Sequence, residues 1–173
     1  MRRYGRVKKH KRIQYGFQKN GEYSERSIDM VSMIIGYAYV VADIFHIGHL
    51  QHLLNCKALC DKLLVGVLTD EATMEKKVEP IVPFEERVRI VSALKCVDVV
   101  VSQNTYSPIA NLKAIKPDIF FESTSHSDEA VSQHTDIMKS IDGKIISLPY
   151  YPTQSSSHIK QKILDEWKGA KHE

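Results

Sequence analysis

The sequence has no long hydrophobic run, few cysteines and no acidic residue among its first twenty. The longest apolar stretch, residues 33–41, is shorter than the about 20 residues that a membrane-spanning helix needs, and no stretch has the flanks of a signal peptide. We therefore expect a cytoplasmic protein. The three cysteines form no C-x-x-C pair, which argues against a disulfide scaffold, and we expect Cys56 and Cys60 to pack in the core.

The basic charge is concentrated at the amino terminus. Of the 24 lysines and arginines, eight lie in residues 1–20, so the rest of the chain has 16 of them against 21 acidic residues. We interpret residues 1–30 as a basic, polar extension, with residues 21–32 as a polar connection to one domain over residues 31–173. Such a basic run is more typical of a solvated segment than of a contact with nucleic acid or an anionic membrane, so nucleic-acid binding is not expected.

Buried strands and amphipathic helices alternate through the domain. Runs of β-branched and aromatic residues predict strands over residues 33–41, 62–70, 97–102, 116–123 and 143–151. A helical period of apolar residues predicts helices over residues 48–60, 84–94, 109–115, 128–141 and 155–170. This order predicts an α/β fold, a Rossmann-like doubly wound parallel sheet of about five strands with helices on both faces. In such sheets, ligands bind outside the carboxyl ends of the strands.

Two histidines lie at the first of these carboxyl ends, in the stretch ADIFHIGHL. His46 and His49 come where a strand ends and a helix begins, with Gly48 between them. Free backbone N–H groups at a helix start favour anions, and imidazoles can donate hydrogen bonds to phosphate oxygens. A metal site would usually need two further ligands. Ordinary packing or capping at the start of the helix is the third possibility.

Three motifs resemble those of a known enzyme superfamily. The stretches DIFHIGHLQHLLNCKALCDKLLVGVLTDE, PFEERVRIVSALKCVDVVV and SSSHIKQKI follow one another as they do in the H-x-G-H nucleotidyltransferases. Within that superfamily they are similar to the glycerol-3-phosphate and the choline- or ethanolamine-phosphate cytidylyltransferases, and the resemblance covers about residues 33–165. It implies transfer of CMP from CTP to a small phosphorylated alcohol or a phosphonate, with release of pyrophosphate. It also implies Mg²⁺ bound with the nucleotide and a homodimer.

The resemblance assigns roles to individual residues of this chain. His46, His49 and Lys77 would be the catalytic residues that hold the triphosphate and the transition state. The residues that would bind the nucleotide are Asp43, Gly48, Arg87, Glu122, Ser155, Ser156 and Ser157. Plainer alternatives exist for several of them: Lys77 as a solvated lysine, Arg87 as the partner of a nearby carboxylate, and the serines as caps of the last helix.

The chain departs from the family pattern at three places. Val40 replaces a glycine before the histidines, and FESTSHSDE replaces the usual pair of aspartates after the fourth strand. Tyr150 and Tyr151 stand where an arginine usually precedes the serine motif. Two alternatives therefore stay open. One is an adenylyltransferase that uses ATP, of the flavin or heptose-phosphate type, and the other is a catalytically degenerate nucleotide-binding domain.

Overall fold

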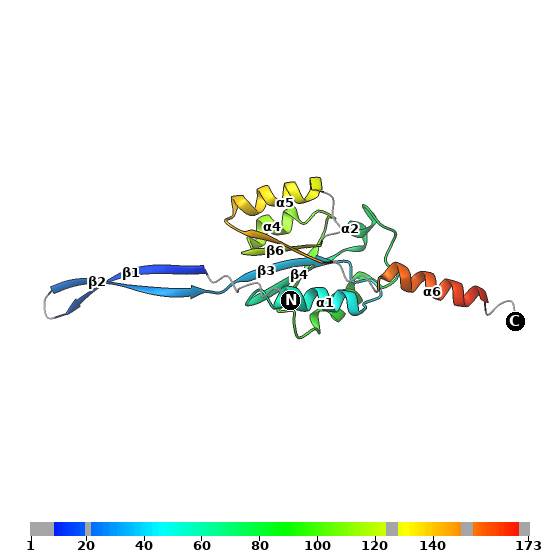
Figure 1. Cartoon of the computed structure of the whole chain (residues 1–173), viewed down its shortest axis with the longest axis horizontal. Helices are drawn as coiled ribbons and strands as arrows, with labels where there is room; N and C mark the ends of the chain where they lie inside the picture. Colours follow the sequence, from blue (N-terminus) through cyan, green and yellow to red (C-terminus); the bar gives the residue numbers. More distant parts are fainter. Residues whose placement is uncertain (1–8, 20–21, 124–127, 150–153, 170–173) are drawn as a thin grey trace.

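The computed structural model describes residues 9–19, 22–123, 128–149 and 154–169. Five parallel strands in this part of the chain form a sheet in the order β5-β4-β3-β6-β7 (Figure 1). The strands are β3 (Ile35–Val40), β4 (Lys62–Leu68), β5 (Val99–Gln103), β6 (Ile119–Ser123) and β7 (Lys144–Leu148). The helices are α1 (Ile47–Lys57), α2 (Asp70–Met74), α3 (Phe84–Ser92), α4 (Ile109–Ile115), α5 (Asp128–Ser140) and α6 (Ser156–Gly169). This arrangement confirms the predicted Rossmann-like doubly wound α/β fold.

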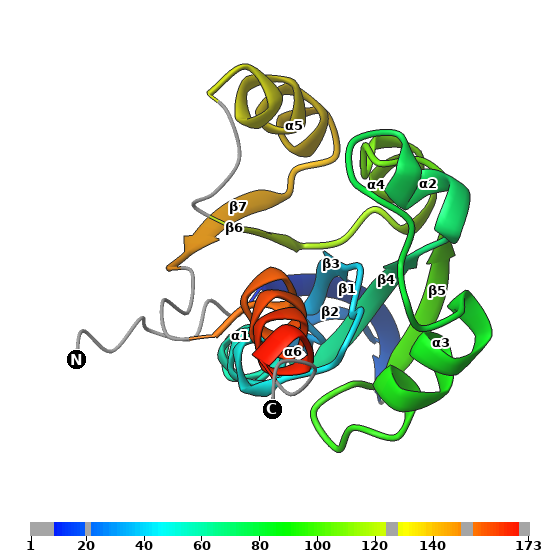
Figure 2. The ribbon, with the colours of Figure 1, turned by 90° about the vertical axis from the view of Figure 1, so that its right-hand side faces the viewer.

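Helices cover both faces of the sheet. Alternate residues of each strand point to opposite sides, so each strand contributes to a core on either face. In β3, Ala38 belongs to a core that also contains Leu53 of α1 and Val91 of α3. Its neighbour Tyr37 packs in a second core with Leu112 of α4. Figure 2 shows α4 and α5 on one side of the sheet and α1 and α3 on the other.

The amino-terminal segment differs from the prediction. Residues 21–32, expected to be a polar connection, contribute strand β2 (Glu22–Ser32), which pairs antiparallel with β1 (Lys9–Lys19) in a sheet of its own. The hairpin lies at the end of the domain opposite α6 (Figure 1). Polar residues fill most positions of β2, so no pattern of a buried strand marks it in the sequence.

The predicted elements of the domain are present with small changes at their ends. The five-residue helix α2 was not expected, because a single turn is too short for a helical period to show. It begins at Asp70, so the strand before it ends at Leu68 rather than at Asp70. Cys56 and Cys60 are buried in the core, as predicted. Across the described ranges, no helix is both long and apolar enough to cross a membrane.

The strand order reverses between β3 and β6. Strands β4 and β5 lie on one side of β3, and strands β6 and β7 lie on the other. Connections that leave neighbouring strands in opposite directions open a crevice at their carboxyl ends, which is where ligands bind in doubly wound sheets. The loop that joins β3 to α1 and contains Asp43 lies at this crevice.

Candidate active site

The start of α1 fixes both histidines of the H-x-G-H motif. His46 is the N-cap residue of α1, and its Nδ1 atom accepts a hydrogen bond from the backbone N–H of Gly48, with an N–N distance of 3.0 Å. The Nδ1 atom of His49 accepts a hydrogen bond from the backbone N–H of His46, at 3.4 Å. Since both Nδ1 atoms accept, each neutral ring has its proton on Nε2, from which it can be donated to a ligand. The ring centres are 4.0 Å apart, so the two rings lie side by side.

Burial keeps the histidines of the site neutral. Burial, together with the nearby His46 and His52, lowers the pKa of His49 to about 3. Lys77 acts in the same direction, and Asp43 acts in the opposite one. Burial also lowers the pKa of His46 and that of His52. At neutral pH, the motif histidines are therefore uncharged hydrogen-bond donors.

Gly48 has no room for a side chain. A Cβ atom there would lie 2.8 Å from Cε1 and 2.9 Å from Nδ1 of His46, and 3.2 Å from the carbonyl oxygen of Gln154. Any larger residue would push the His46 ring out of its position. The glycine therefore allows the first turn of α1 to approach the segment that leads into α6.

Asp43 connects three segments around the motif. Its Oδ1 atom accepts hydrogen bonds from the backbone N–H groups of Ile81 and Val82, each at 3.0 Å, and its Oδ2 atom lies 2.6 Å from Nζ of Lys160. Its carbonyl oxygen accepts a hydrogen bond from the hydroxyl of Ser156, at 2.5 Å. Burial raises the pKa of Asp43, but the bonds from Lys160 and from the two N–H groups outweigh burial and bring the pKa below its ordinary value. The carboxylate thus joins the loop after β3 to α6 and to the loop before α3.

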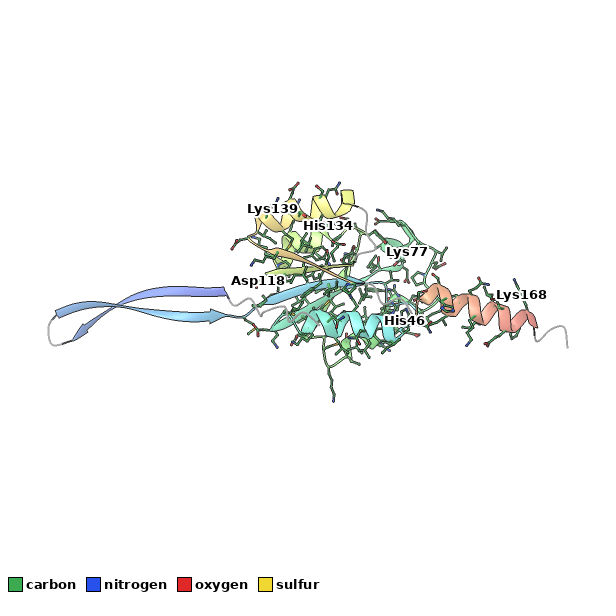
Figure 3. All side chains as sticks on the ribbon, in the orientation of Figure 1. His46, Lys77, Asp118, His134, Lys139 and Lys168 are labelled. Atoms are coloured by element: carbon green, nitrogen blue, oxygen red, sulfur yellow. The ribbon has the colours of Figure 1, made fainter. Side chains whose placement is uncertain are left out.

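Lys77 reaches the site from the loop after α2. Its backbone N–H donates to the carbonyl oxygen of Thr73 at 2.9 Å, and its Nζ atom lies 6.0 Å from the ring centre of Tyr106. Figure 3 shows Lys77 and His46 at the same end of the sheet, towards α6. The exposed side chain of Lys77 is long and adaptable, and it lines the same cavity as His46 and His49.

The three serines form the start of α6. Ser155 caps the helix, because its Oγ atom accepts a hydrogen bond from the backbone N–H of His158 at 3.1 Å. The hydroxyl of Ser156 donates to the loop after β3, and Ser157 lies in the wall of the cavity described below. The hydroxyls of Ser155 and Ser156 thus have partners within the protein. The backbone N–H groups of the first turn are the ones suited to bind an anion.

Arg87 lies behind the site rather than in its wall. Its side chain is fully buried. It donates four hydrogen bonds, to the carbonyl oxygens of Val82 (2.9 Å), Leu68 (2.8 Å) and Val41, and to Oδ1 of Asp70 (2.5 Å). The guanidinium therefore fastens the ends of β3 and β4 to α2 and to the loop before α3.

Glu122 is also fully buried and does not line the cavity. Its Oε2 atom lies 2.8 Å from Nδ1 of His134 on α5. Figure 3 shows His134 well away from His46. The residues that the structure describes do not include residues 124–127 of the divergent FESTSHSDE stretch, nor Tyr150 and Tyr151.

A cavity of about 950 Å³ unites most of the predicted site at the carboxyl end of the sheet, a volume suited to a nucleotide. The predicted residues that line it are Asp43, His46, Gly48, His49, Lys77, Ser155, Ser156 and Ser157. Further lining residues that we did not identify from the sequence include Gln51, His52, Asn55, Tyr106 and Lys160. The first three lie on the same face of α1 as Gly48, so the helical period would have found them, whereas nothing in the sequence marks Tyr106.

The metal interpretation of the histidine pair lacks further ligands. Within the described ranges, no group of three or more His, Cys, Asp or Glu side chains could hold a metal ion. A zinc site takes about four protein ligands when it is structural and about three when it is catalytic. The geometry of His46 and His49 is that of a capped helix start that lines the cavity.

Comparison with known proteins identifies the family. Residues 38–162, more than half of the chain, match the family described as Cytidylyltransferase-like. The bifunctional protein HldE of Granulibacter bethesdensis is 29% identical over 135 residues, which are 77% of this chain and 28% of that protein. The bifunctional protein HldE of Escherichia coli O139:H28 is 30% identical over 131 residues, 75% of this chain and 27% of that protein. The chain thus spans little more than a quarter of the length of these relatives.

A solved structure agrees with this match over most of the domain. The lipopolysaccharide core biosynthesis protein from Thermoplasma volcanium superposes with a TM-score of 0.63 at 30% sequence identity. The similarity covers 69% of this chain and 99% of that protein. As the three motifs predicted, the chain belongs to the cytidylyltransferase-like family of nucleotidyltransferases.

Proposed function

We propose that this chain transfers a nucleotidyl group from a nucleoside triphosphate to the phosphate of a small acceptor, with release of pyrophosphate. The observation that supports this most strongly is the pair of motif histidines. His46 and His49 line the cavity and are held through Nδ1 by backbone N–H groups, which leaves a neutral Nε2 donor on each ring. Lys77 and the helix starts at α1 and α6 add positive potential around the same space.

In the proposed reaction, an oxygen of the acceptor phosphate attacks the α-phosphorus of the triphosphate, in line with the leaving pyrophosphate. A new phosphorus–oxygen bond forms. The bond from the α-phosphorus to the bridging oxygen breaks, and its electron pair leaves with pyrophosphate. Negative charge on the phosphoryl oxygens is stabilised by His46 and His49, because these donors are fixed before the reaction. Lys77 balances the charge of the departing pyrophosphate.

Asp43 and Arg87 are positioning residues in this proposal. The Asp43 carboxylate and carbonyl bind Lys160 and Ser156, and so hold the start of α6 against the loop that leads to His46. Arg87 holds the same loop through the carbonyl oxygen of Val41. Neither side chain has to touch the reacting phosphates for its loss to lower turnover.

We infer that ATP is the donor and a sugar phosphate is the acceptor. A lipopolysaccharide core is built from sugars, so similarity to HldE proteins and to a lipopolysaccharide core biosynthesis protein favours the heptose-phosphate type of adenylyltransferase. The second candidate is CTP with a small phosphorylated alcohol or a phosphonate. That candidate is favoured by the similarity of the three sequence motifs to the cytidylyltransferases.

Mg²⁺ bound with the triphosphate is part of the proposal. Mg²⁺ keeps several waters and binds mainly through substrate phosphates, so it does not need a protein cage, and no such cage is present among the described residues. The carboxylate of Asp43, which lies in the cavity wall, is already bound to Lys160 and two backbone N–H groups. The ion would supply charge neutralisation on the phosphates, while His46, His49 and Lys77 supply the contacts from the protein.

Pyrophosphate release tests the proposal directly. ATP and CTP are each supplied with Mg²⁺ and with heptose 1-phosphate, glycerol 3-phosphate or phosphoethanolamine, and turnover should require an acceptor. His46→Ala and His49→Ala should each lower turnover by about 100-fold or more, as expected for the loss of a transition-state donor. The matched control is His158→Ala, since His158 is exposed on α6 outside the cavity wall, and it should keep the wild-type rate. Near-wild-type turnover in both motif variants would overturn the proposal, and nucleotide binding without turnover for any acceptor would favour the degenerate domain.

A further inference from the structure

The loop between β5 and α4 meets the loop after α2 at the cavity. Tyr106 of the first loop lines the cavity, and the proposed reaction gives it no role. Lys77, which the proposed reaction uses, lies in the second loop. The backbone N–H of Tyr106 donates a hydrogen bond to Oε2 of Glu75, at 3.1 Å. Glu75 is the C-cap residue of α2 and comes two residues before Lys77, so this bond ties the start of the second loop to Tyr106.

The aromatic ring of Tyr106 faces two lysine ammonium groups. The Nζ atom of Lys76 lies 5.2 Å from the ring centre, and that of Lys77 lies 6.0 Å from it. Both distances are within the range of a cation–π attraction. Burial raises the pKa of Tyr106, so its phenol is neutral at neutral pH, and the lysines meet the negative face of the ring rather than a phenolate. Lys77 lines the cavity and Lys76 does not, so the ring can affect the site through Lys77.

A buried hydrogen-bond network fixes the backbone of Tyr106 from the side of the sheet. Its carbonyl oxygen accepts a hydrogen bond from Nε2 of Gln103, at 3.3 Å. Gln103 is buried, and its Oε1 atom accepts a hydrogen bond from the hydroxyl of Tyr37 at 2.5 Å. The amide nitrogen of Asn111 on α4 donates to the same hydroxyl at 2.8 Å. Bonds at both backbone groups, from Gln103 and to Glu75, therefore set the position of Tyr106 before any ligand binds.

We propose that Tyr106 is a positioning residue for Lys77, whose ammonium group its ring attracts and holds at the wall of the cavity. A lysine side chain has many rotamers, and restricting them before the substrate binds lowers the entropy lost on reaching the transition state. Glu75 supports the arrangement, because its carboxylate binds the backbone of Tyr106. Tyr106 does not have to touch the reacting phosphates. The inference rests on the proposed function and adds the residue that orients Lys77.

A double-mutant cycle of Tyr106→Leu and Lys77→Met tests the inference, with the triphosphate and acceptor that give the highest wild-type turnover. Tyr106→Leu should lower kcat/KM for the triphosphate by about 3- to 10-fold, the effect expected of a half-buried cation–π contact, and leave KM for the acceptor unchanged. In the Lys77→Met background, Tyr106→Leu should have no further effect, because a residue that acts through Lys77 has nothing left to position. Equal losses in both backgrounds would overturn the inference.

Two further variants show whether the ring itself is responsible. Tyr106→Phe keeps the ring and loses only the hydroxyl, so it should keep the wild-type rate. A loss in Tyr106→Phe as large as that in Tyr106→Leu would assign the role to the hydroxyl and overturn the inference. Glu75→Ala should also lower kcat/KM, whereas Glu79→Ala is the matched control and should keep it, because Glu79 is an exposed acid of the same loop outside the cavity wall. Thermal unfolding confirms that all variants are folded.

NMR of the free protein separates this inference from the proposed function. Protons over the face of an aromatic ring resonate upfield, so the Hε signal of Lys77 should move downfield in Tyr106→Leu and stay in place in Tyr106→Phe. An unmoved signal in Tyr106→Leu would overturn the inference even when the wild type is active. Should the signal move in a wild type that shows no turnover, the proposed reaction fails. The inference then stands only when Tyr106→Leu weakens the binding of Mg²⁺-pyrophosphate, measured by calorimetry, in the presence of Lys77 and not in Lys77→Met.

Discussion

Replacement of Arg87 by methionine tests whether this residue supports the site from behind. Methionine fills much of the same volume but has no hydrogen-bond donor. In Arg87→Met, four acceptors lose their donor, namely the Asp70 carboxylate and the carbonyl oxygens of Val41, Leu68 and Val82. Removing one member of a buried ion pair costs about 3–5 kcal/mol, and each buried carbonyl left without a partner costs about 1 kcal/mol or more. Because these costs overlap and Asp70 is partly exposed, we expect a loss of about 4 kcal/mol.

Urea unfolding followed by circular dichroism measures this loss as a lower transition midpoint at an unchanged slope. Arg87→Lys should give an intermediate loss, since a compact ammonium cannot replace a planar fork that reaches four acceptors. Arg89→Met is the matched control, because Arg89 is exposed on the same helix, and it should change stability by no more than about 0.5 kcal/mol. Kinetics at a temperature well below unfolding should show a lower kcat with little change in KM, as the loop that leads to His46 loses its anchor.

One result would refute the reasoning on Arg87. If Arg87→Met lost less than about 1 kcal/mol of stability while turnover fell by about 100-fold, the side chain would have to act on the substrate itself. A positioning residue affects the site through the fold, so its removal cannot leave the free energy of unfolding nearly unchanged.

Three further predictions concern the start of α1 and its supports. Gly48→Ala should lower turnover by about 100-fold, because the new Cβ atom would lie only 2.8 Å from the His46 ring and would displace it. The free energy of unfolding, measured with urea, should fall by only about 1 kcal/mol, the cost of a lost helix cap. The folded-state pKa of His49, about 3, lies below the ordinary value of 6.5, so the unfolded state binds the proton more tightly. The stabilisation from the neutral ring is thus full above about pH 6.5 and is lost as the pH falls towards about 3, with a slope of up to about 1.4 kcal/mol per pH unit. Urea unfolding at pH 7.5 and pH 5 should show a smaller loss for His49→Asn than for the wild type, and equal losses would contradict the depressed pKa. Lys160→Met should raise the pKa of Asp43, measured by NMR titration, and destabilise the chain by about 1–3 kcal/mol, measured by urea unfolding. An unchanged pKa of Asp43 would show that the ion pair between Lys160 and Asp43 is not formed in solution.

Much of the domain can be predicted from the sequence because its signals are local. The alternation of apolar strands and helical periods predicts the five strands, and the turn from β3 into α1 places His46 and His49 at a helix start. The strand β2 escapes prediction, because most of its residues are polar and no apolar pattern marks a strand that pairs with β1. The helix α2 escapes because it is a single turn.

The rest of the site depends on contacts between segments far apart in the chain. The sequence motif assigns nucleotide contacts to Asp43 and Arg87. It contains no sign that the backbone N–H groups of Ile81 and Val82 bind Asp43, or that Arg87 is buried among four acceptors. Both assignments stay predictions, now with a positioning role as the simpler account. The cavity-lining positions of Gln51 and Asn55 carry a local signal, the helical period from Gly48, and would follow from extending the motif by two turns.

The central claim is that His46 and His49 bind the phosphates of a nucleotide through their Nε2 atoms. A crystal structure with Mg²⁺ and a non-hydrolysable triphosphate, the α,β-methylene analogue of ATP or of CTP, tests it most directly. The account predicts phosphate oxygens within about 3 Å of Nε2 of both histidines, with each Nδ1 atom still bound to its backbone N–H. A triphosphate bound elsewhere in the cavity, with both Nε2 atoms facing water, would contradict it.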